Sequence, residues 1–258
     1  MPDVQIKEQR YRDERPAEHF APFHARTRDH GPEAHIYELV RTLTVGYALI
    51  AFRARSIGSE NVPSGPVILA PNHASFMDHF FCGAFVRRRI QFMAKSQLFA
   101  PGIPSYVFSH GGVFPVRRGV ADEEGFTTAY AVLDRGGALG MYCEGGRSRN
   151  GELAERARPG IGRLALESGA PVVPVAILGS HQVRNWKRLQ FPKVIVRYGE
   201  PFRFEAERSP SRERQQQAAD AILDRIREMH TELVRVGSRG ALRAGRRHAP
   251  PPDAARIA

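Results

Sequence analysis

Cysteine and long apolar runs are both scarce in this sequence. The 258 residues include only two cysteines, Cys82 and Cys143, and both lie in apolar segments. Their spacing fits neither a zinc knuckle nor a disulfide framework, so it favours a reducing compartment. The first 34 residues are crowded with charge, Pro and His and contain no apolar core of a secretory signal. These absences predict a protein that stays in the cytoplasm.

The N-terminal part of the chain has no stretch long enough to cross a bilayer as a helix. Its most apolar run, Thr42 to Phe52, covers eleven residues between two arginines, whereas a spanning helix needs about 20. Apolar residues nevertheless recur at helical spacing around this run, at Ile36, Leu39, Val40, Leu43, Tyr47, Ile50 and Ala54. The spacing predicts an amphipathic helix over 35–57. Two interpretations stay open, an interfacial helix on a membrane surface or a helix that covers the domain core.

Acidic residues are outnumbered by basic ones. The chain carries 38 Lys and Arg against 27 Asp and Glu, a formal net charge of +11. Its partner is therefore expected to be anionic: a nucleic acid, a phosphorylated substrate or an acidic membrane surface. The arginines are dispersed, and the sequence has no helix-turn-helix, zinc-finger or RNP aromatic pattern, which argues against nucleic acid. A basic membrane- or nucleic-acid-binding module is the alternative to an enzyme.

From residue 58 onward, short apolar runs alternate with helical patterns, which is typical of an α/β sheet. We expect strands at Val67–Ala70, Gln91–Ala94, Val113–Val116, Ala138–Cys143, Val172–Leu178 and Val194–Tyr198. We expect helices at Phe76–Arg88, Asp122–Arg135, Gly160–Ser168 and Pro210–Val236. The pattern predicts a single α/β domain over 58–236, with a mostly parallel central sheet flanked by helices.

The segments around this domain differ from it in composition. Residues 1–34 form a polar N-terminal segment, followed by the amphipathic helix over 35–57. Residues 237–258 are rich in Gly, Arg, Pro and Ala. Such a composition buries little apolar surface, so we expect a disordered basic tail.

The motif N-H-A-S-F-M-D over residues 72–78 follows an apolar strand, the place where open α/β sheets carry their chemistry. His73 in this position can take a proton from a hydroxyl near neutral pH, and a carboxylate on its other ring nitrogen would fix the tautomer. Pro71 favours a break before the motif, so Asp78 can fold back toward His73 from the first turn of a helix. The motif predicts a general base and its orienting carboxylate.

Three other interpretations compete with this one. A histidine at a strand end is often a packed or capping residue. A dinuclear metal site would need His at positions 74 and 76, where the chain has Ala74 and Phe76, so we expect no metal. Ser75 lacks the G-x-S-x-G context that would expose a nucleophile.

Two further constellations come directly after apolar strands. Arg117 and Arg118 end the segment G-G-V-F-P-V-R-R over 111–118, where they suit a phosphate but also fit solvated surface charges. The segment E-G-G-R-S-R over 144–149 combines glycines, which let the backbone approach an anion, with arginines. It lacks the Lys-Ser/Thr ending of a P-loop, which argues against nucleotide binding.

Taken in order, these motifs resemble a known family. The segments 72–78, 112–118, 144–148 and 173–177 are similar to the four sequence blocks of the glycerolipid acyltransferases, which include the bacterial 1-acylglycerol-3-phosphate acyltransferases, and the similarity covers about 60–200. The resemblance implies transfer of a fatty acyl group from acyl-CoA or acyl carrier protein to a hydroxyl of lysophosphatidic acid or a related phosphorylated glycerol. It also implies a peripheral protein at the cytoplasmic face of an anionic membrane, with no metal or redox cofactor.

The resemblance also assigns roles to residues. His73 matches the general base, with Asp78 as its partner. Arg117 is the natural match for the arginine that binds the acceptor phosphate, with Arg118 a close second. The remaining substrate-binding matches are Glu144, Gly145, Gly146, Arg147, Ser148 and Pro174.

One position departs from the family pattern. The third block usually reads Glu-Gly-Thr-Arg-Ser, and Gly146 stands where Thr is expected. The loss of that hydroxyl puts the acceptor in doubt more than the reaction. A glycolipid such as a phosphatidylinositol mannoside, an ornithine lipid or another lysophospholipid is the alternative acceptor.

Overall fold

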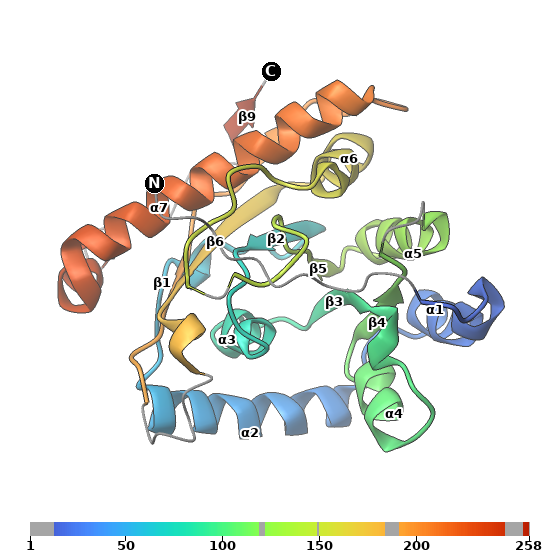
Figure 1. Cartoon of the computed structure of the whole chain (residues 1–258), viewed down its shortest axis with the longest axis horizontal. Coiled ribbons are helices and arrows are strands. Elements are labelled where there is room, and N and C mark those ends of the chain that lie inside the picture. Colours follow the sequence, from blue (N-terminus) through green and yellow to red (C-terminus); the bar gives the residue numbers. More distant parts are fainter. Residues whose placement is uncertain (1–12, 119–121, 149, 184–190, 246–254, 258) are drawn as a thin grey trace.

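The computed structural model describes residues 13–118, 122–148, 150–183, 191–245 and 255–257. The elements form a central sheet with helices on both of its faces (Figure 1). The predicted fold class, an α/β domain with a mostly parallel sheet, is confirmed.

The sheet orders its strands β1-β7-β6-β2-β5-β3-β4, with β8 paired to β6 and β9 paired to β8. The strands are β1 Arg55–Ile57, β2 Val67–Pro71, β3 Ile90–Lys95, β4 Val113–Val116, β5 Ala138–Gly140, β6 Val172–Leu178, β7 Ile195–Tyr198, β8 Phe202–Phe204 and β9 Ala255–Ile257. Only the pairs that β6 makes with β7 and β8 are antiparallel among those described. The central strands β2 and β6 are buried along nearly their whole length, which explains their continuous apolar sequences.

The register of the parallel strands brings their carboxyl ends to one edge. Ala70 of β2 lies opposite Pro174 of β6, and Leu69 lies opposite Gly140 of β5. Gly140 is needed there because an added Cβ would lie 2.1 Å from the ring of Phe92 on β3. The segments after β2, β3, β4 and β5 therefore emerge side by side.

Helices cover both faces of the sheet. They are α1 Ala21–Asp29, α2 Ala34–Phe52, α3 Asp78–Ala84, α4 Ile103–His110, α5 Glu123–Asp134, α6 Pro159–Ser168 and α7 Arg212–Gly245, with short 3₁₀ turns η1 Ala17–Phe20, η2 Ser59–Asn61 and η3 Ser96–Leu98. One core joins the sheet to α5, α6 and α7, and the other joins it to α2 and α3. In Figure 1, α3 lies between α2 and the sheet, and the rings of Phe52 and Phe81 meet edge to face at 5.6 Å.

Several elements differ from the sequence prediction. The helix expected over 76–88 begins only at Asp78, because its carboxylate closes a turn over the residues before it. The strand expected over 138–143 ends at Gly140. The elements α1, α4, β1, β8 and β9 were not predicted. For β1, β8 and β9 the reason is their length, because strands of three residues carry too little alternation to be recognised.

The amphipathic helix expected over 35–57 is α2, which ends at Phe52. The helix ends there because Arg53 adopts left-handed dihedral angles (φ 47°). The last positions predicted as helix belong to β1 instead. No helix in the described part of the chain combines the length and apolarity needed to cross a membrane.

The tail over 237–258 differs in part from the disorder predicted for it. Gly237 breaks the helical geometry of α7 (φ 63°, ψ 175°), but helix continues to Gly245. Ala255–Ile257 then pairs with β8. Ala and Arg are strong helix formers, which explains the continuation. Residues 246–254, like Arg149 and the first twelve residues, lie outside the described part of the chain.

Candidate active site

The end of β2 is anchored to β6 by a buried asparagine. The side chain of Asn72 accepts a hydrogen bond from the Ile177 amide (2.7 Å) and donates one to the Ile177 carbonyl (3.1 Å). The chain leaves the sheet at this point, so the next residue, His73, is held above the carboxyl edge. The first side chain of the motif thus ties the backbone that carries the imidazole to β6.

Asp78 orients the imidazole of His73. Its Oδ2 lies 2.9 Å from Nδ1 of His73 and accepts the backbone amides of Ala74 and Ser75, each at 2.7 Å. Asp78 is fully buried at the start of α3. Because a carboxylate accepts, Nδ1 carries the proton and Nε2 keeps a lone pair. The predicted base and its partner do meet, through the turn that the sequence spacing required.

The surroundings keep the His73 ring neutral and fixed in plane. Burial lowers the pKa of His73 below its ordinary value, outweighing the opposing effect of Asp78, and the charges of Arg147 and Arg118 lower it further. Tyr142 stacks on the ring with centroids 3.8 Å apart. A neutral imidazole with a free Nε2 is the form that accepts a proton.

Glu144 ties the segment after β5 to His73. Its Oε1 accepts the His73 amide (2.8 Å) and its Oε2 accepts the Ala154 amide (3.3 Å). Burial raises the pKa of Glu144 to about 7. Both oxygens are used by backbone amides, so the carboxyl group braces the base rather than facing the neighbouring cavity.

The rest of the Gly-Gly segment also supports His73. The amide of Ser148 donates to the His73 carbonyl (2.8 Å), while its hydroxyl donates to Asn150 (2.9 Å). The carbonyl of Gly145 accepts from Arg118 (2.9 Å), and Gly145 has a left-handed φ of 66° with the side chain of Arg158 packed against it. Gly146 is buried next to them.

A cavity of about 150 Å³ opens beside His73. Three cations line it, Lys95 at the end of β3 together with Arg118 and Arg147. Apolar side chains complete the wall, among them Phe76, Phe92, Leu98, Phe108 and Tyr142. The cavity therefore offers positive charge and apolar surface within the same space as the base.

Two neighbouring cavities extend this space. One of about 340 Å³ shares Arg118 and Tyr142 with the first and adds Arg117 and Arg158 to its lining. The other, of about 110 Å³, shares Phe92 and Phe108 with the first and reaches side chains of α2: Tyr37, Val40, Arg41 and Thr44. His79, whose pKa burial lowers to about 4, lines both this apolar cavity and the one beside His73.

The predicted substrate-binding residues do not all lie together. Arg118 and Arg147 line the cavity beside His73, whereas Arg117 lines only the larger neighbour of the three cavities described. The amide of Arg117 donates to Asp122 (2.5 Å), and its Nε is buried without a partner. Pro174 lies inside β6, where its carbonyl accepts the Gly199 amide (2.8 Å), and lines none of these cavities.

Lys95 and Tyr142 were missed by the sequence analysis. Lys95 directly follows the strand predicted over 91–94 and is the last residue of β3, and a cation at that place was a usable signal. Tyr142 was included in the strand predicted over 138–143 and treated as sheet, but the chain leaves the sheet at Gly140. No cluster of three or more His, Cys, Asp or Glu side chains suited to a metal ion occurs in the described ranges.

The chain is similar to a protein family in sequence and to a solved structure in fold. Residues 53–178 match the family model described as Acyltransferase. The chain also resembles the crystal structure of the 1-acyl-sn-glycerophosphate (LPA) acyltransferase PlsC from Thermotoga maritima, with a TM-score of 0.58, 22% identity, and coverage of 82% of this chain and 88% of that one. At this identity the likeness concerns the fold.

Three curated relatives are similar in sequence. A probable 1-acyl-sn-glycerol-3-phosphate acyltransferase of Mycoplasma genitalium is 24% identical over 62% of this chain and 62% of its own length. The chloroplastic 1-acyl-sn-glycerol-3-phosphate acyltransferase BAT2 of Brassica napus is 26% identical over 49% of this chain and 37% of its own. The lyso-ornithine lipid O-acyltransferase of Pseudomonas aeruginosa is 30% identical over 50% of this chain and 49% of its own length. The matches thus span about a third to three fifths of these relatives.

Proposed function

We propose, from the membership of residues 53–178 in the Acyltransferase family, that this protein is an O-acyltransferase acting on a phosphorylated lysolipid. The observation that carries the proposal is the His73–Asp78 contact at 2.9 Å beside a cavity lined by three cations. The preferred acceptor is lysophosphatidic acid, the substrate in the names of two relatives, and the product is phosphatidic acid. The donor is a thioester, acyl-CoA or acyl carrier protein.

The proposed reaction is direct transfer. The acceptor hydroxyl gives its proton to Nε2 of His73 while its oxygen attacks the thioester carbonyl carbon. The tetrahedral intermediate then collapses to the ester and expels the thiolate, which takes up the proton from the imidazolium. The reaction needs no metal, redox cofactor or covalent enzyme intermediate. Cys143 is a poor nucleophile for this step, because it is fully buried and burial raises its pKa well above the ordinary value.

The acceptor phosphate is bound by Arg118 and Arg147, with Lys95 as a third cation. All three line the cavity that holds His73, so a phosphate there keeps the hydroxyl of a short glycerol unit near the base. Arg117, the first candidate from the sequence, lines the adjoining cavity and contributes charge from there. A lyso-ornithine lipid is the second candidate acceptor, since one relative is named for it.

We expect Arg118→Ala to raise the KM for lysophosphatidic acid by a factor of about 10 to 100, because a charge-assisted hydrogen bond contributes about 1.5–3 kcal/mol. Arg118 also donates to the Gly145 carbonyl, so the comparison uses a neutral acceptor, monoacylglycerol, on the same variant. Purified wild type and variant are incubated with acyl-CoA and a panel of acceptors: lysophosphatidic acid, glycerol 3-phosphate, lysophosphatidylinositol, lyso-ornithine lipid and monoacylglycerol.

Arg214→Ala is the matched control for this experiment, because Arg214 is a partly exposed arginine paired with Glu207 beyond the site (3.5 Å). An equal rise in KM for phosphorylated and neutral acceptors would argue against phosphate binding by Arg118. Product from lyso-ornithine lipid alone would move the second acceptor to first place. Release of free fatty acid without any ester product would contradict acyl transfer.

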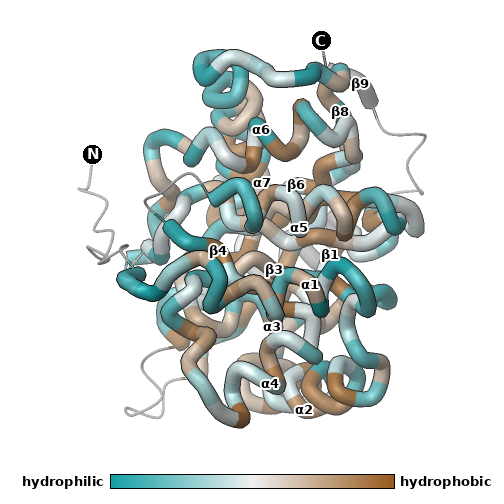
Figure 2. Tube along the Cα trace, turned by 90° about the vertical axis from the view of Figure 1, so that its right-hand side faces the viewer, coloured by the Kyte–Doolittle hydropathy of each residue, from teal (hydrophilic) through white to brown (hydrophobic). Residues whose placement is uncertain are grey.

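We propose that the protein binds the cytoplasmic face of an anionic membrane through α2 and α4. Ala48 and Phe52 of α2 face the core, whereas Leu43 and Ile50 are 65% and 84% exposed. Further exposed apolar side chains lie on the same two helices, at Leu39, Tyr47, Leu49, Ile103 and Tyr106. Figure 2 shows apolar colour on both helices at one end of the molecule. The apolar cavity under α2 supports an entry route for an acyl chain from this side.

We expect a Leu43→Ser, Ile50→Ser variant to bind vesicles of anionic phospholipid at least tenfold more weakly, because burying two large side chains contributes about 1.5–3 kcal/mol each. Sedimentation with vesicles measures the binding. Val234→Ser is the control, since Val234 is 60% exposed on α7, apart from this surface. Equal weakening in both variants, or none in the double variant, would contradict a specific membrane face.

A further inference from the structure

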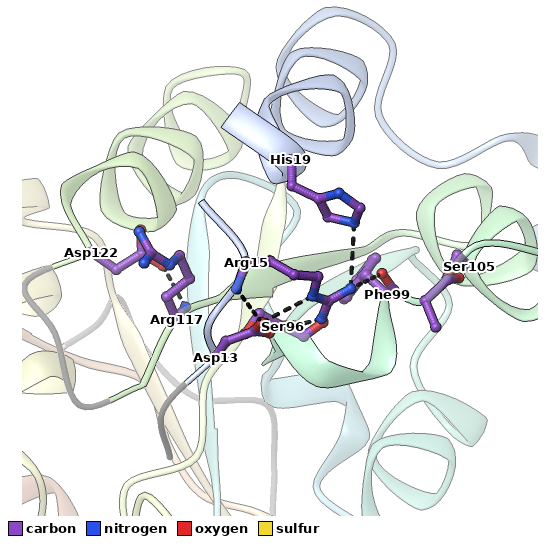
Figure 3. A network of polar contacts seen from close by, with 9 residues as sticks. Asp13, Arg15, His19, Ser96, Phe99, Ser105, Arg117 and Asp122 are labelled. Atoms are coloured by element: carbon purple, nitrogen blue, oxygen red, sulfur yellow. Dashed lines mark hydrogen bonds and ion pairs between the residues drawn. The ribbon is translucent and has the colours of Figure 1, made fainter. Parts of the chain in front are cut away.

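The segment over residues 13–29, here called the N-terminal strap, precedes the region that matches the family. It crosses the turn after β3, as the close view in Figure 3 shows. The guanidinium of Arg15 donates to the carbonyl of Phe99 through Nη1 (2.7 Å) and to the carbonyl of Ser96 through Nη2 (2.8 Å). One side chain thus bonds the first residue of the turn η3 and the residue that follows it.

Arg15 is itself held in place by the strap. Asp13 receives its Nε at 2.9 Å and its Nη2 at 2.8 Å, a two-point contact that fixes the plane of the guanidinium. The same carboxylate accepts the hydroxyl of Ser96 (2.6 Å), and the hydrogen bonds from Arg15 hold the pKa of Asp13 well below its ordinary value. The guanidinium also lies 4.8 Å from the ring centroid of Phe20.

The turn that Arg15 fixes carries part of the site wall. Lys95 immediately precedes η3 and Leu98 ends it, and both line the cavity beside His73. Within the turn, the bond from the Phe99 amide to the Ser96 carbonyl (2.9 Å) is a short-range contact. The contacts from Arg15 and Asp13 come from residues more than eighty positions away in sequence, so they set the position of the turn relative to the rest of the fold.

The helix part of the strap contacts α5, whose first turn borders the larger neighbouring cavity. Nδ1 of His24 lies 2.9 Å from the hydroxyl of Thr128 on α5, and Arg135 donates to the Thr27 carbonyl (2.7 Å). The N-cap of α5, Asp122, accepts the amide of Arg117 (2.5 Å). The strap therefore contacts both the turn after Lys95 and the helix that anchors the segment carrying Arg117.

We propose that Arg15 is a positioning residue for anion binding, which holds Lys95 and Leu98 at the cavity beside His73 from outside the family-matched region. The proposal rests on the proposed function for the identity of the anion, the phosphate of a lysolipid. Arg15 does not line the cavities described and acts through the turn alone. A guanidinium suits this task because it is planar and presents several donors, so one side chain can bond two carbonyls in a fixed geometry.

The test compares Arg15→Ala with Arg15→Lys and with Arg214→Ala as the matched control; the side chains of Arg15 and Arg214 are 29% and 34% exposed. The first measurement is hydrogen exchange of the amides over 96–99. The second is the dissociation constant for lysophosphatidic acid and for monoacylglycerol by calorimetry. We expect Arg15→Ala to speed exchange over 96–99 and to weaken lysophosphatidic acid binding about tenfold, equivalent to about 1.4 kcal/mol, with little change for monoacylglycerol.

For Arg15→Lys we expect an exchange rate and a dissociation constant for lysophosphatidic acid between those of wild type and Arg15→Ala. An ammonium keeps the charge but lacks the planar set of donors that can bond two carbonyls at once. If the amides over 96–99 exchange at the same rate in Arg15→Ala as in wild type, Arg15 does not hold this turn and the proposal is wrong. Faster exchange together with an equal loss of affinity for lysophosphatidic acid and monoacylglycerol, or with no loss for either, would contradict the positioning of Lys95. Arg15 would then be a structural contact only. Neither readout requires turnover, so a wild type that binds lysophosphatidic acid without acylating it would contradict the proposed function and leave this test valid.

Discussion

His73→Ala is expected to lower kcat/KM for acyl transfer about 10³-fold, the middle of the range for loss of a positioned general base. The variant removes the group that accepts the hydroxyl proton, while Asp78 keeps its bonds to the amides of Ala74 and Ser75. The turn and the start of α3 should therefore persist. Steady-state rates with acyl-CoA and lysophosphatidic acid measure the loss, and the thermal midpoint checks the fold.

The pH dependence of the acyl-transfer rate gives a second test of His73 as the base. The neutral form of His73 is the active one, and burial lowers its pKa from the ordinary 6.5. The rate should therefore hold as the pH falls to 6.5 and decline only at lower pH, as the ring takes up a proton. His30→Ala, which removes an exposed histidine at the end of α1, is the control. Residual turnover near wild type in His73→Ala, or an acid limb well above pH 6.5, would rule out His73 as the base.

Asp78→Asn is expected to lower kcat about 10²- to 10³-fold, no more than loss of His73 itself, because the carboxylate acts through the imidazole. Oδ2 of Asp78 accepts the two backbone amides and the Nδ1 proton of His73. An amide oxygen can keep the backbone bonds. Because the same atom also contacts Nδ1 of His73, the NH₂ group then takes the place of Oδ1, which is buried with no partner among the described residues. The neutral amide no longer stabilises the imidazolium that forms when Nε2 takes up the hydroxyl proton.

The kcat of Asp78→Asn is measured beside its thermal midpoint, because Asp78 is fully buried and its removal affects α3 as well. Asp224→Asn is the control, since Asp224 is an exposed carboxylate on α7 paired with Arg227. A folded Asp78→Asn protein with kcat within tenfold of wild type would show that the charge of Asp78 does not support His73 as the base.

The sequence by itself determined the sheet and the core of the site. The apolar runs of β2, β4 and β6 are largely buried. Strands of this kind can be recognised in a sequence from their continuous apolar residues. Parallel strands place their succeeding segments at one edge, so a motif after each strand was enough to expect His73, Arg147 and the pair Arg117 and Arg118 at that edge, although Arg117 was the preferred member of the pair. The turn that joins His73 to Asp78 was expected from their spacing, which a continuous helix cannot satisfy.

Only the tertiary structure decided what each of these groups contacts. Arg117 and Arg118 are adjacent in sequence, yet only Arg118 lines the cavity beside the base, and both oxygens of Glu144 are taken by backbone amides. The contact of Arg15 with Phe99 joins segments with no shared sequence pattern. Periodicity reports which face of an element is buried. The partner of a polar side chain depends on where distant segments end, and packing of the whole chain sets that position.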